Sequence, residues 1–167
     1  VAMQTELTAP PVPYTKSVAH QAGWRWQIPL QERMGNGLVF CSRFMSDEDA
    51  INTLKSQVTG APINEPRVIR FTPGKRRRGW NKNCVALGLS SGFIEPLEST
   101  SIHLIMTGLI RLMRLFPFDG ITQSAIDEYN NKFDSEMSAI LDFIVMHYKA
   151  TQREDSPFWQ QCQRMEI

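Results

Sequence analysis

The sequence predicts a mixed α/β fold, and three patterns carry this prediction. Residues 24–42 alternate apolar and polar side chains around a Met-Gly-Asn-Gly turn, which is typical of an antiparallel hairpin. Residues 46–58 and 123–149 repeat apolar side chains at helical spacing, as amphipathic helices do. The small apolar run at residues 83–88 is typical of a strand buried in an α/β sheet. We expect a further strand at residues 67–72.

The remaining segments complete the expected organisation. Residues 98–116 are apolar around most of a helical circumference, which predicts a buried helix. Three prolines in residues 7–15 favour an extended connector. We expect a single domain in which residues 16–100 carry the sheet, residues 98–150 form a helical segment and residues 151–167 form a polar tail with one apolar anchor.

The charge balance excludes some classes of function. The 167 residues include 18 Lys and Arg against 17 Asp and Glu, so the large basic excess that drives non-specific nucleic-acid or anionic-membrane binding is missing. The most apolar stretch is interrupted by His103, Arg111 and Arg114, so we expect no membrane span. We therefore predict neither a nucleic-acid partner nor a membrane partner.

Cysteine and histidine positions bear on the compartment and on metal binding. The three cysteines are widely spaced and odd in number, which favours idle thiols in a reducing, cytoplasmic compartment. The histidines share no ligand spacing, so we expect no metal site. These residues are Cys41, Cys84 and Cys162, and His20, His103 and His147.

One segment, from Cys84 to Phe116, favours a ligand site. It predicts a strand, a turn rich in Ser and Gly, and then a helix, whose N-terminal N–H groups and partial positive charge suit an anion. Glu98 lies at this helix start, where its carboxylate could lie close to a bound anion or substrate. In the alternative interpretation, Glu98 only complements the helix dipole while Ser99 or Thr100 caps the helix.

Three other features each have two interpretations. Glu95, which the following proline favours in an extended conformation, is either a structural or solvated acid or a partner for the basic run at residues 75–78. The basic run at residues 75–78 is either a solvated turn or a contact for a phosphate or an acidic patch. Trp24 and Trp26 share one face of a strand, where they form either part of a core or a wall against a flat cofactor or substrate.

Two blocks of sequence resemble a known family. Gly23-Trp24-Arg25-Trp26-Gln27-Ile28-Pro29 is similar to the Trp-x-Trp-x-Ile-Pro signature of flavin-dependent tryptophan halogenases. Phe93-Ile94-Glu95-Pro96-Leu97-Glu98-Ser99-Thr100 is similar to a second block of the same family. Shorter matches at Arg70-Phe71, at Gly79-Trp80, at Asn83-Cys84-Val85 and at Ser156-Pro157-Phe158-Trp159 extend the resemblance over nearly the whole chain.

The resemblance implies a fold and an activity. The fold would be part of the flavin-monooxygenase type, an FAD-binding α/β fold with long helices packed on it. The family uses reduced FAD as co-substrate, oxygen, and chloride or bromide to make hypohalous acid, which halogenates an electron-rich aromatic such as tryptophan or indole next to a lysine. The partners implied are that aromatic substrate and a separate flavin reductase, with a homodimer as a candidate assembly.

The resemblance also assigns residues. Glu98 would be the catalytic carboxylate, and the backbone amides at Thr100 and Ser101 would bind the halide. Flavin contacts would fall on Leu89, Ser99 and Ile102. The signature residues near the flavin would be Trp24, Trp26, Ile28 and Pro29, with the tryptophan pair keeping substrate away from the flavin.

The resemblance covers only the middle of the family's sequence. The family's N-terminal Gly-x-Gly-x-x-Gly fingerprint and its catalytic lysine do not occur in these residues, so we expect this piece to be inactive by itself and to expose apolar surface. Two other classes stay open at this point. They are a halogenase-like flavoprotein hydroxylase and a non-catalytic remnant or fragment.

Overall fold

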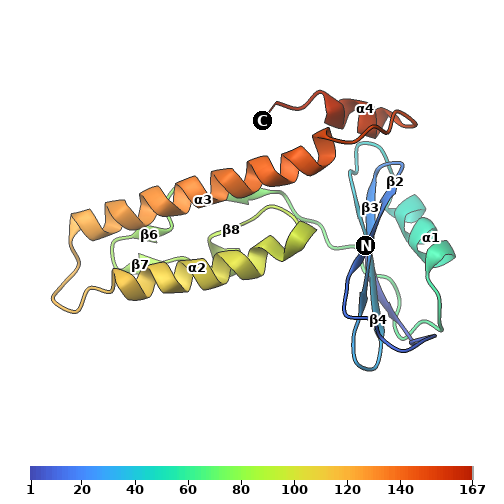
Figure 1. The fold of residues 1–167 in the computed structure, drawn as a ribbon, viewed down its shortest axis with the longest axis horizontal. Helices are drawn as coiled ribbons and strands as arrows, with labels where there is room; N and C mark the ends of the chain where they lie inside the picture. The colour runs from blue at the N-terminus through green and yellow to red at the C-terminus, as the bar shows by residue number, and fades with distance from the viewer. Residues whose placement is uncertain (167) are drawn as a thin grey trace. The chain divides into compact units, whose positions relative to one another are not determined.

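The computed structural model describes residues 1–166, which divide into two compact units. The first, called here the sheet unit, comprises Val1–Arg70 and Tyr148–Glu166. The second, the helical unit, comprises Phe71–His147. Both units contain strands and helices, which confirms the predicted mixed α/β class (Figure 1).

A four-stranded antiparallel sheet forms the centre of the sheet unit (Figure 1). The two predicted strands are confirmed, because they pair along their full lengths with Trp26 opposite Gly37. The predicted turn at residues 34–37 is wrong, because these residues lie inside the second strand and the chain turns at residues 30–33, where the Leu30 N–H donates to the Arg33 carbonyl at 2.9 Å. The two outer strands carry no strong alternation and were not predicted. In the spatial order β1-β4-β3-β2, the strands are β1 (Ala2–Thr5), β4 (Met34–Phe40), β3 (Gly23–Pro29) and β2 (Lys16–His20).

Helix α1 (Asp47–Gln57) packs on one face of this sheet. The predicted cap is confirmed, because the Ser46 side chain accepts from the Asp49 N–H at 3.1 Å. Leu38 of β4 and Leu54 of α1 belong to one buried cluster on this face. Arg25 lies on the same side and donates from Nη1 to the Gln57 carbonyl at 3.0 Å, which satisfies an acceptor at the end of the helix.

The opposite face of the sheet is aromatic. Trp24 and Trp26 lie opposite Val39 and Gly37, so their side chains share the face turned away from α1. A Cβ placed on Gly37 would lie 2.2 Å from the Trp26 ring, which shows that the indole covers the glycine directly. Trp24 is only 7% exposed, and its Nε1 donates to the Tyr148 hydroxyl at 2.9 Å.

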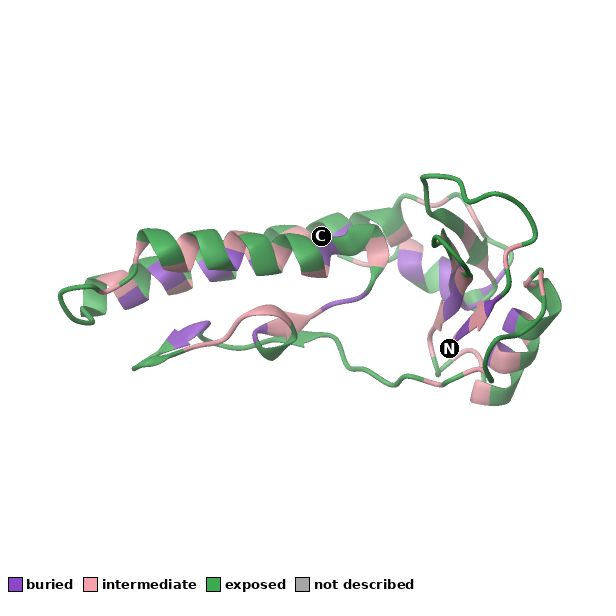
Figure 2. Ribbon diagram, turned by 90° about the horizontal axis from the view of Figure 1, so that it is seen from below, coloured by how far each residue is buried: buried purple, intermediate pink, exposed green. Residues whose placement is uncertain are grey.

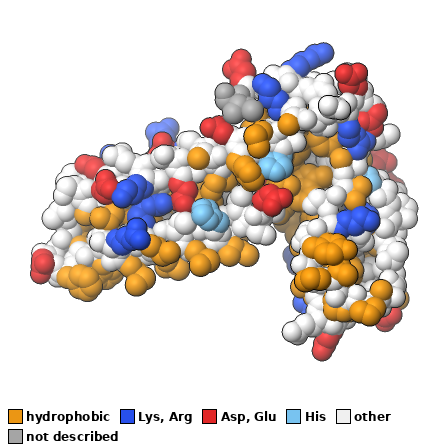
Figure 3. Space-filling model, viewed as in Figure 1, with side chains coloured by type: hydrophobic (Ala, Val, Ile, Leu, Met, Phe, Trp, Pro, Cys, Tyr) orange, Lys and Arg blue, Asp and Glu red, His pale blue; other side chains and the backbone are white. Residues whose placement is uncertain are grey.

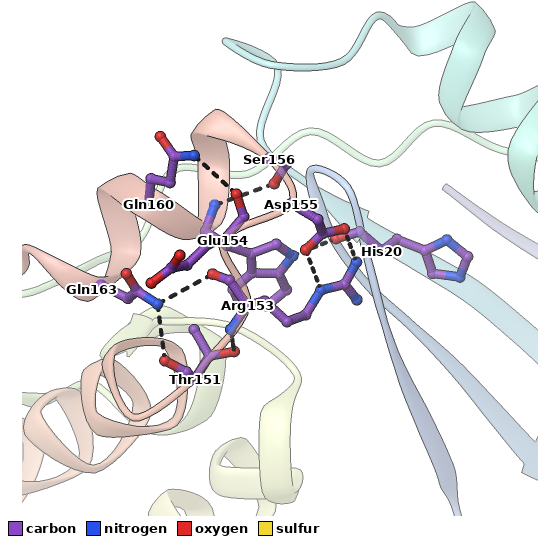
Figure 4. Close-up of polar contacts among 9 residues, drawn as sticks. His20, Thr151, Arg153, Glu154, Asp155, Ser156, Gln160 and Gln163 are labelled. Atoms are coloured by element: carbon purple, nitrogen blue, oxygen red, sulfur yellow. Dashed lines mark hydrogen bonds and ion pairs between the residues drawn. The ribbon is translucent and has the colours of Figure 1, made fainter.

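A short helix, α4 (Pro157–Gln163), completes this aromatic cluster. Ser156 caps it, and the Trp159 ring stacks on Tyr148 with centroids 5.9 Å apart. Figure 4 shows the polar contacts before the helix, where Arg153 pairs with an aspartate and Gln163 donates to the Thr151 carbonyl at 3.1 Å. The expected polar tail therefore contains a helix that its weak periodicity did not predict.

The helical unit contains two antiparallel helices, α2 (Thr100–Arg114) and α3 (Gln123–Lys149), of which the last two residues of α3 belong to the sheet unit (Figure 1). Both correspond to predicted helices. Four two-residue strands accompany them: β5 (Gly74–Lys75), β6 (Trp80–Asn81), β7 (Cys84–Val85) and β8 (Gly92–Phe93).

The strand segments are tied to α3 through Trp80. Its ring meets Tyr129 edge-on at 5.7 Å. Asn130 bonds both backbone groups of Trp80, accepting from N at 2.9 Å and donating to O at 2.8 Å. The side-chain amide of Asn130 thus makes the two hydrogen bonds that a neighbouring strand would make. In this way α3 satisfies the backbone N–H and C=O groups of a segment far away in the sequence.

Two predicted strands are wrong. Residues 67–72 form no strand and contribute only an isolated bridge between Arg67 and Ala2. Residues 83–88 do not form a buried strand, since only Cys84 and Val85 pair, in a local hairpin with β6, and Cys84 is exposed. Short apolar runs do not distinguish a sheet strand from a packed turn by periodicity alone.

The prediction that the helix at residues 98–116 is buried is also wrong. Within residues 1–166, the buried residues of α2 are only Thr100 and Gly108. Figure 2 draws much of the two long helices as exposed, and Figure 3 shows hydrophobic side chains along α2. The reason is that α2 is apolar on several sides, whereas the described neighbours α3 and the Gly88–Ser90 turn contact only part of its circumference. Exposed apolar residues of α2 are Ile102, Ile105, Met106, Leu109, Ile110 and Met113.

The basic run is anchored at its first two residues. Lys75 pairs with the Asp134 carboxylate of α3 and donates to Ser138 Oγ at 3.3 Å, and Arg76 donates from Nε to the Ser90 carbonyl at 3.0 Å. The acidic-contact interpretation therefore holds for Lys75. None of the helices within residues 1–166 has the length and hydropathy needed to cross a bilayer.

The contact between Trp26 and Gly37 leads to a stability prediction. Gly37→Ala places a methyl group where the indole lies, so we expect the free energy of unfolding to fall by about 1–3 kcal/mol. Chemical denaturation measures the change. Gly74→Ala is the matched control, because a Cβ there meets nothing within 4 Å; equal losses in both variants would contradict the assignment.

The environment of His20 leads to a pH prediction. Its Nε2 is buried without a hydrogen-bond partner, and burial, followed by the nearby Arg25 and Arg153 charges, lowers its pKa. The unfolded chain therefore binds this proton more readily, so stability falls as the pH drops through about 6.5, the ordinary histidine value. We expect His20→Gln to reduce this loss in denaturation curves recorded across that range. An unchanged loss in His20→Gln would contradict the role assigned to His20.

Candidate active site

The candidate site is the turn that joins β8 to α2 in the helical unit. Ile94 and Glu95 are both buried and anchor its first part. A single 3-10 turn, η2 (Leu97–Ser99), follows and continues into α2, with the Thr100 N–H donating to the Leu97 carbonyl. The site is thus a tight backbone turn that directly follows two buried residues.

Two consecutive residues in this turn have left-handed backbone conformations. Glu98 has φ 54° and ψ 23°, and Ser99 has φ 53° and ψ 27°. Each such residue other than glycine costs about 1–2 kcal/mol, so the surrounding contacts must hold the turn in place. Strained backbone of this kind is found preferentially at functional sites.

The predicted cap on α2 is wrong. Ser99 precedes the helix in a left-handed conformation, and its side chain makes no capping hydrogen bond. Glu98 and Ser99 are both exposed, so their side chains are accessible at the helix start. The solvated interpretation of Glu95 is also wrong, since that residue is buried.

The start of α2 provides N–H groups for an anion. Backbone conformation changes from left-handed at Ser99 to right-handed at Thr100, and the Ser99 N–H donates to the Pro96 carbonyl at 3.4 Å. Thr100 uses its N–H on the Leu97 carbonyl, whereas Ser101 lies in the first turn, where N–H groups have no acceptor within the helix. With the positive end of a 15-residue helix, this geometry suits a small anion.

The residues expected to contact flavin lie on adjoining elements. Leu89 is in the turn η1 (Gly88–Ser90), which packs against α2. Gly88, with φ 58°, brings this turn so close that a Cβ there would lie 3.2 Å from Ile105. Leu89 is 72% exposed and Ile102 is 63% exposed. Both residues therefore offer accessible apolar side chains, of the kind that lines many ligand sites.

The tryptophan signature lies in the sheet unit, on β3. The interpretation as core holds for Trp24, which is buried and bonded to Tyr148. Trp26 is half-buried and Ile28 is exposed, so the later part of the signature offers apolar surface on the same sheet face. Pro29 ends the strand.

One polar residue of the helical unit escaped the sequence analysis. Glu136 of α3 reaches both His103 and Arg111 of α2. No local spacing in the sequence relates these three positions, and only the pairing of the two helices brings them together.

Comparison of whole folds defines the class of protein. The flavin-dependent halogenase Xcc4156 from Xanthomonas campestris superposes with a TM-score of 0.96 at 49% sequence identity, over 99% of this chain and 34% of that one. BrvH, a flavin-dependent halogenase from Brevundimonas sp. BAL3, gives a TM-score of 0.95 at 49% identity, with coverage of 99% and 34%. The fold is therefore that of a segment of a flavin-dependent halogenase.

The family model for tryptophan halogenase matches residues 1–167, so the chain belongs to the tryptophan halogenase family. A curated relative, 7-chloro-L-tryptophan 6-halogenase KtzR from Kutzneria sp. (strain 744), is 40% identical over 149 residues, which are 89% of this chain and 29% of that protein. The chain thus spans about a third of the length of the proteins it matches. The resemblance inferred from the two sequence blocks is confirmed.

The left-handed turn leads to a stability prediction. Ser99→Gly removes the steric cost of a left-handed side-chain-bearing residue, so we expect the free energy of unfolding to rise by up to about 1 kcal/mol. Ser101→Gly, in the regular helix, should lower it by about 1 kcal/mol. Denaturation curves of the two variants provide the test, and a destabilised Ser99→Gly protein would contradict the left-handed assignment.

Proposed function

We propose that the complete protein containing this chain halogenates an electron-rich aromatic substrate, such as tryptophan or indole, with reduced FAD, oxygen and chloride or bromide. The observation that carries the proposal is the turn at Glu98 and Ser99, which opens the N-terminus of α2 beside a carboxylate. Family membership over all 167 residues supports it. Reduced FAD with oxygen supplies the two-electron oxidation of halide to hypohalous acid.

The halide would bind at the backbone amides of Thr100 and Ser101. The dipole of α2 and its first-turn N–H groups stabilise a negative charge at this place. In this structure the Thr100 N–H bonds Leu97, so we assign the principal contact to Ser101. The adjoining apolar side chains of Leu89 and Ile102, together with Ser99, would form one wall for the flavin.

Glu98 would act on the oxidant and the substrate. In the net step, the aromatic C–H and HOX give the aromatic C–X and water. An exposed carboxylate can accept a hydrogen bond from HOX or from the substrate, and it can take up the proton that the ring releases. The left-handed backbone at Glu98 fixes where this carboxylate leaves the chain.

The tryptophan signature would have a separate role. Trp24 anchors the aromatic cluster through Tyr148, so we assign the surface toward flavin to Trp26, Ile28 and Pro29. A wall of this kind would keep the aromatic substrate away from flavin and so suppress its hydroxylation. The odd number of widely spaced cysteines fits a reducing, cytoplasmic setting, in which a separate reductase would supply reduced FAD.

The substrate is proposed as a class. The Kutzneria relative is named for a chlorinated tryptophan, whereas the two structures at 49% identity are described only as flavin-dependent halogenases. We therefore propose an indole-type aromatic, in a protein for which a homodimer is a candidate assembly.

Replacing Glu98 tests the proposal. In the complete protein, supplied with a flavin reductase, bromide and tryptophan or indole, we expect Glu98→Gln to lower the rate of brominated product by at least about 100-fold, because the shape remains and the charge is lost. Mass spectrometry of the brominated product over time measures the rate. Flavin binding should persist in the variant. Glu128→Gln, at an α3 residue paired with Lys132, is the matched control.

The products of the wild type separate the classes of function. A product heavier than the substrate by the replacement of hydrogen with bromine supports the halogenase hypothesis. Hydroxylated product would instead support the hydroxylase, and no product with bound flavin would support a non-catalytic protein. Full bromination by Glu98→Gln would remove Glu98 from the mechanism.

A further inference from the structure

Three side chains join the two long helices of the helical unit, and we call His103, Arg111 and Glu136 the Glu136 cluster. Glu136 of α3 accepts from Arg111 Nη2 through Oε2 at 2.5 Å. Its other oxygen, Oε1, lies 3.4 Å from His103 Nε2. His103 is in the first turn of α2 and Arg111 is in the last, so a single carboxylate contacts both ends of that helix.

The Arg111 end of the cluster is well anchored. The Arg111 side chain is 11% exposed and that of Glu136 is 18% exposed, so water screens this pair weakly. The guanidinium carbon lies 5.3 Å from the centroid of the buried Tyr129 ring. Burial raises the pKa of Tyr129, while Arg111 acts in the opposite direction. Loss of Glu136 would leave a largely buried cation without its carboxylate.

The His103 end is close to the candidate site. Thr100, Ser101 and His103 share the first turn of α2, where backbone positions are rigidly coupled. The turn before them is held in an unfavourable conformation at Glu98 and Ser99, so its relaxation would move the helix start. Glu136 contacts this helix start from α3 through His103, whose side chain is 61% exposed.

We propose that Glu136 is a positioning residue for the halide site. By fixing His103 against Arg111, it sets the direction of the N–H groups at Thr100 and Ser101. The inference rests on the proposed function, since halide binding at these amides is part of that function. It assigns Glu136 no contact with the halide, the substrate or the flavin.

The test compares two glutamates of α3 in the complete protein. Glu136→Gln weakens the bridge to α2, whereas Glu128→Gln breaks only a pair with Lys132, four residues along the same helix. We expect Glu136→Gln to raise the KM for bromide about tenfold, because small displacements of binding groups are costly. The kcat at saturating bromide and the KM for the aromatic substrate should stay within about twofold. Glu128→Gln should match the wild type in all three.

A second measurement does not depend on turnover. Amide hydrogen exchange at Ser101, Ile102 and His103 should be faster in Glu136→Gln than in Glu128→Gln, with exchange in the middle of α3 unchanged. His103→Ala should give a smaller increase at the same amides, because the Arg111 contact remains. A general loss of folding would instead speed exchange throughout both helices, which separates positioning from global instability.

The outcomes are distinguishable. If the wild type brominates and Glu136→Gln equals Glu128→Gln in bromide KM and in exchange, the positioning role is overturned while the proposed function stands. If exchange rises but the KM for bromide does not, Glu136 holds α2 without serving the halide, and the inference is again overturned. If the wild type makes no brominated product, the proposed function fails, and with it the halide role of Glu136.

Discussion

The left-handed turn at Glu98 and Ser99 is the constraint on which the candidate site depends. It lets the chain leave the buried pair Ile94 and Glu95 and enter α2 within a few residues, so a carboxylate and first-turn amides lie beside one another. Such a turn costs free energy at each residue. The buried residues Ile94 and Glu95 before the turn, and the packing of α2 against α3 after it, stabilise this turn.

Long-range polar contacts provide much of that support. Asn130 completes the backbone hydrogen bonds of Trp80, Lys75 pairs with Asp134, and Glu136 joins two residues of α2. In each case α3 satisfies a group that its own segment leaves unsatisfied. This helix therefore supplies polar partners to the strand segments and to α2 of the unit, in addition to its buried apolar residues.

The sheet unit follows the same principle with aromatic groups. The Trp26 ring fills the space above Gly37, and Trp24 continues through Tyr148 to the stacked ring of Trp159. The glycine on β4 is needed because an indole lies on it, and the Trp24 side chain is part of a core. Within the family signature, Trp24 is therefore buried in the core, whereas the side chains of Trp26 and Ile28 are partly accessible.

The sequence alone determined the helices with strong periodicity, the two strands β3 and β4 but not the turn between them, the Ser46 cap and the family, because these depend on local spacing or on contiguous motifs. Two strands at residues 67–72 and 83–88 were wrong, and α4 was missed, because short segments take their conformation from distant partners. The sequence predicted exposed apolar surface without its location, and only the tertiary structure decided that this surface lies on α2 and that Glu136 contacts two residues of that helix. Those properties depend on which surfaces meet when α2 and α3 pack, and local sequence does not encode that pairing.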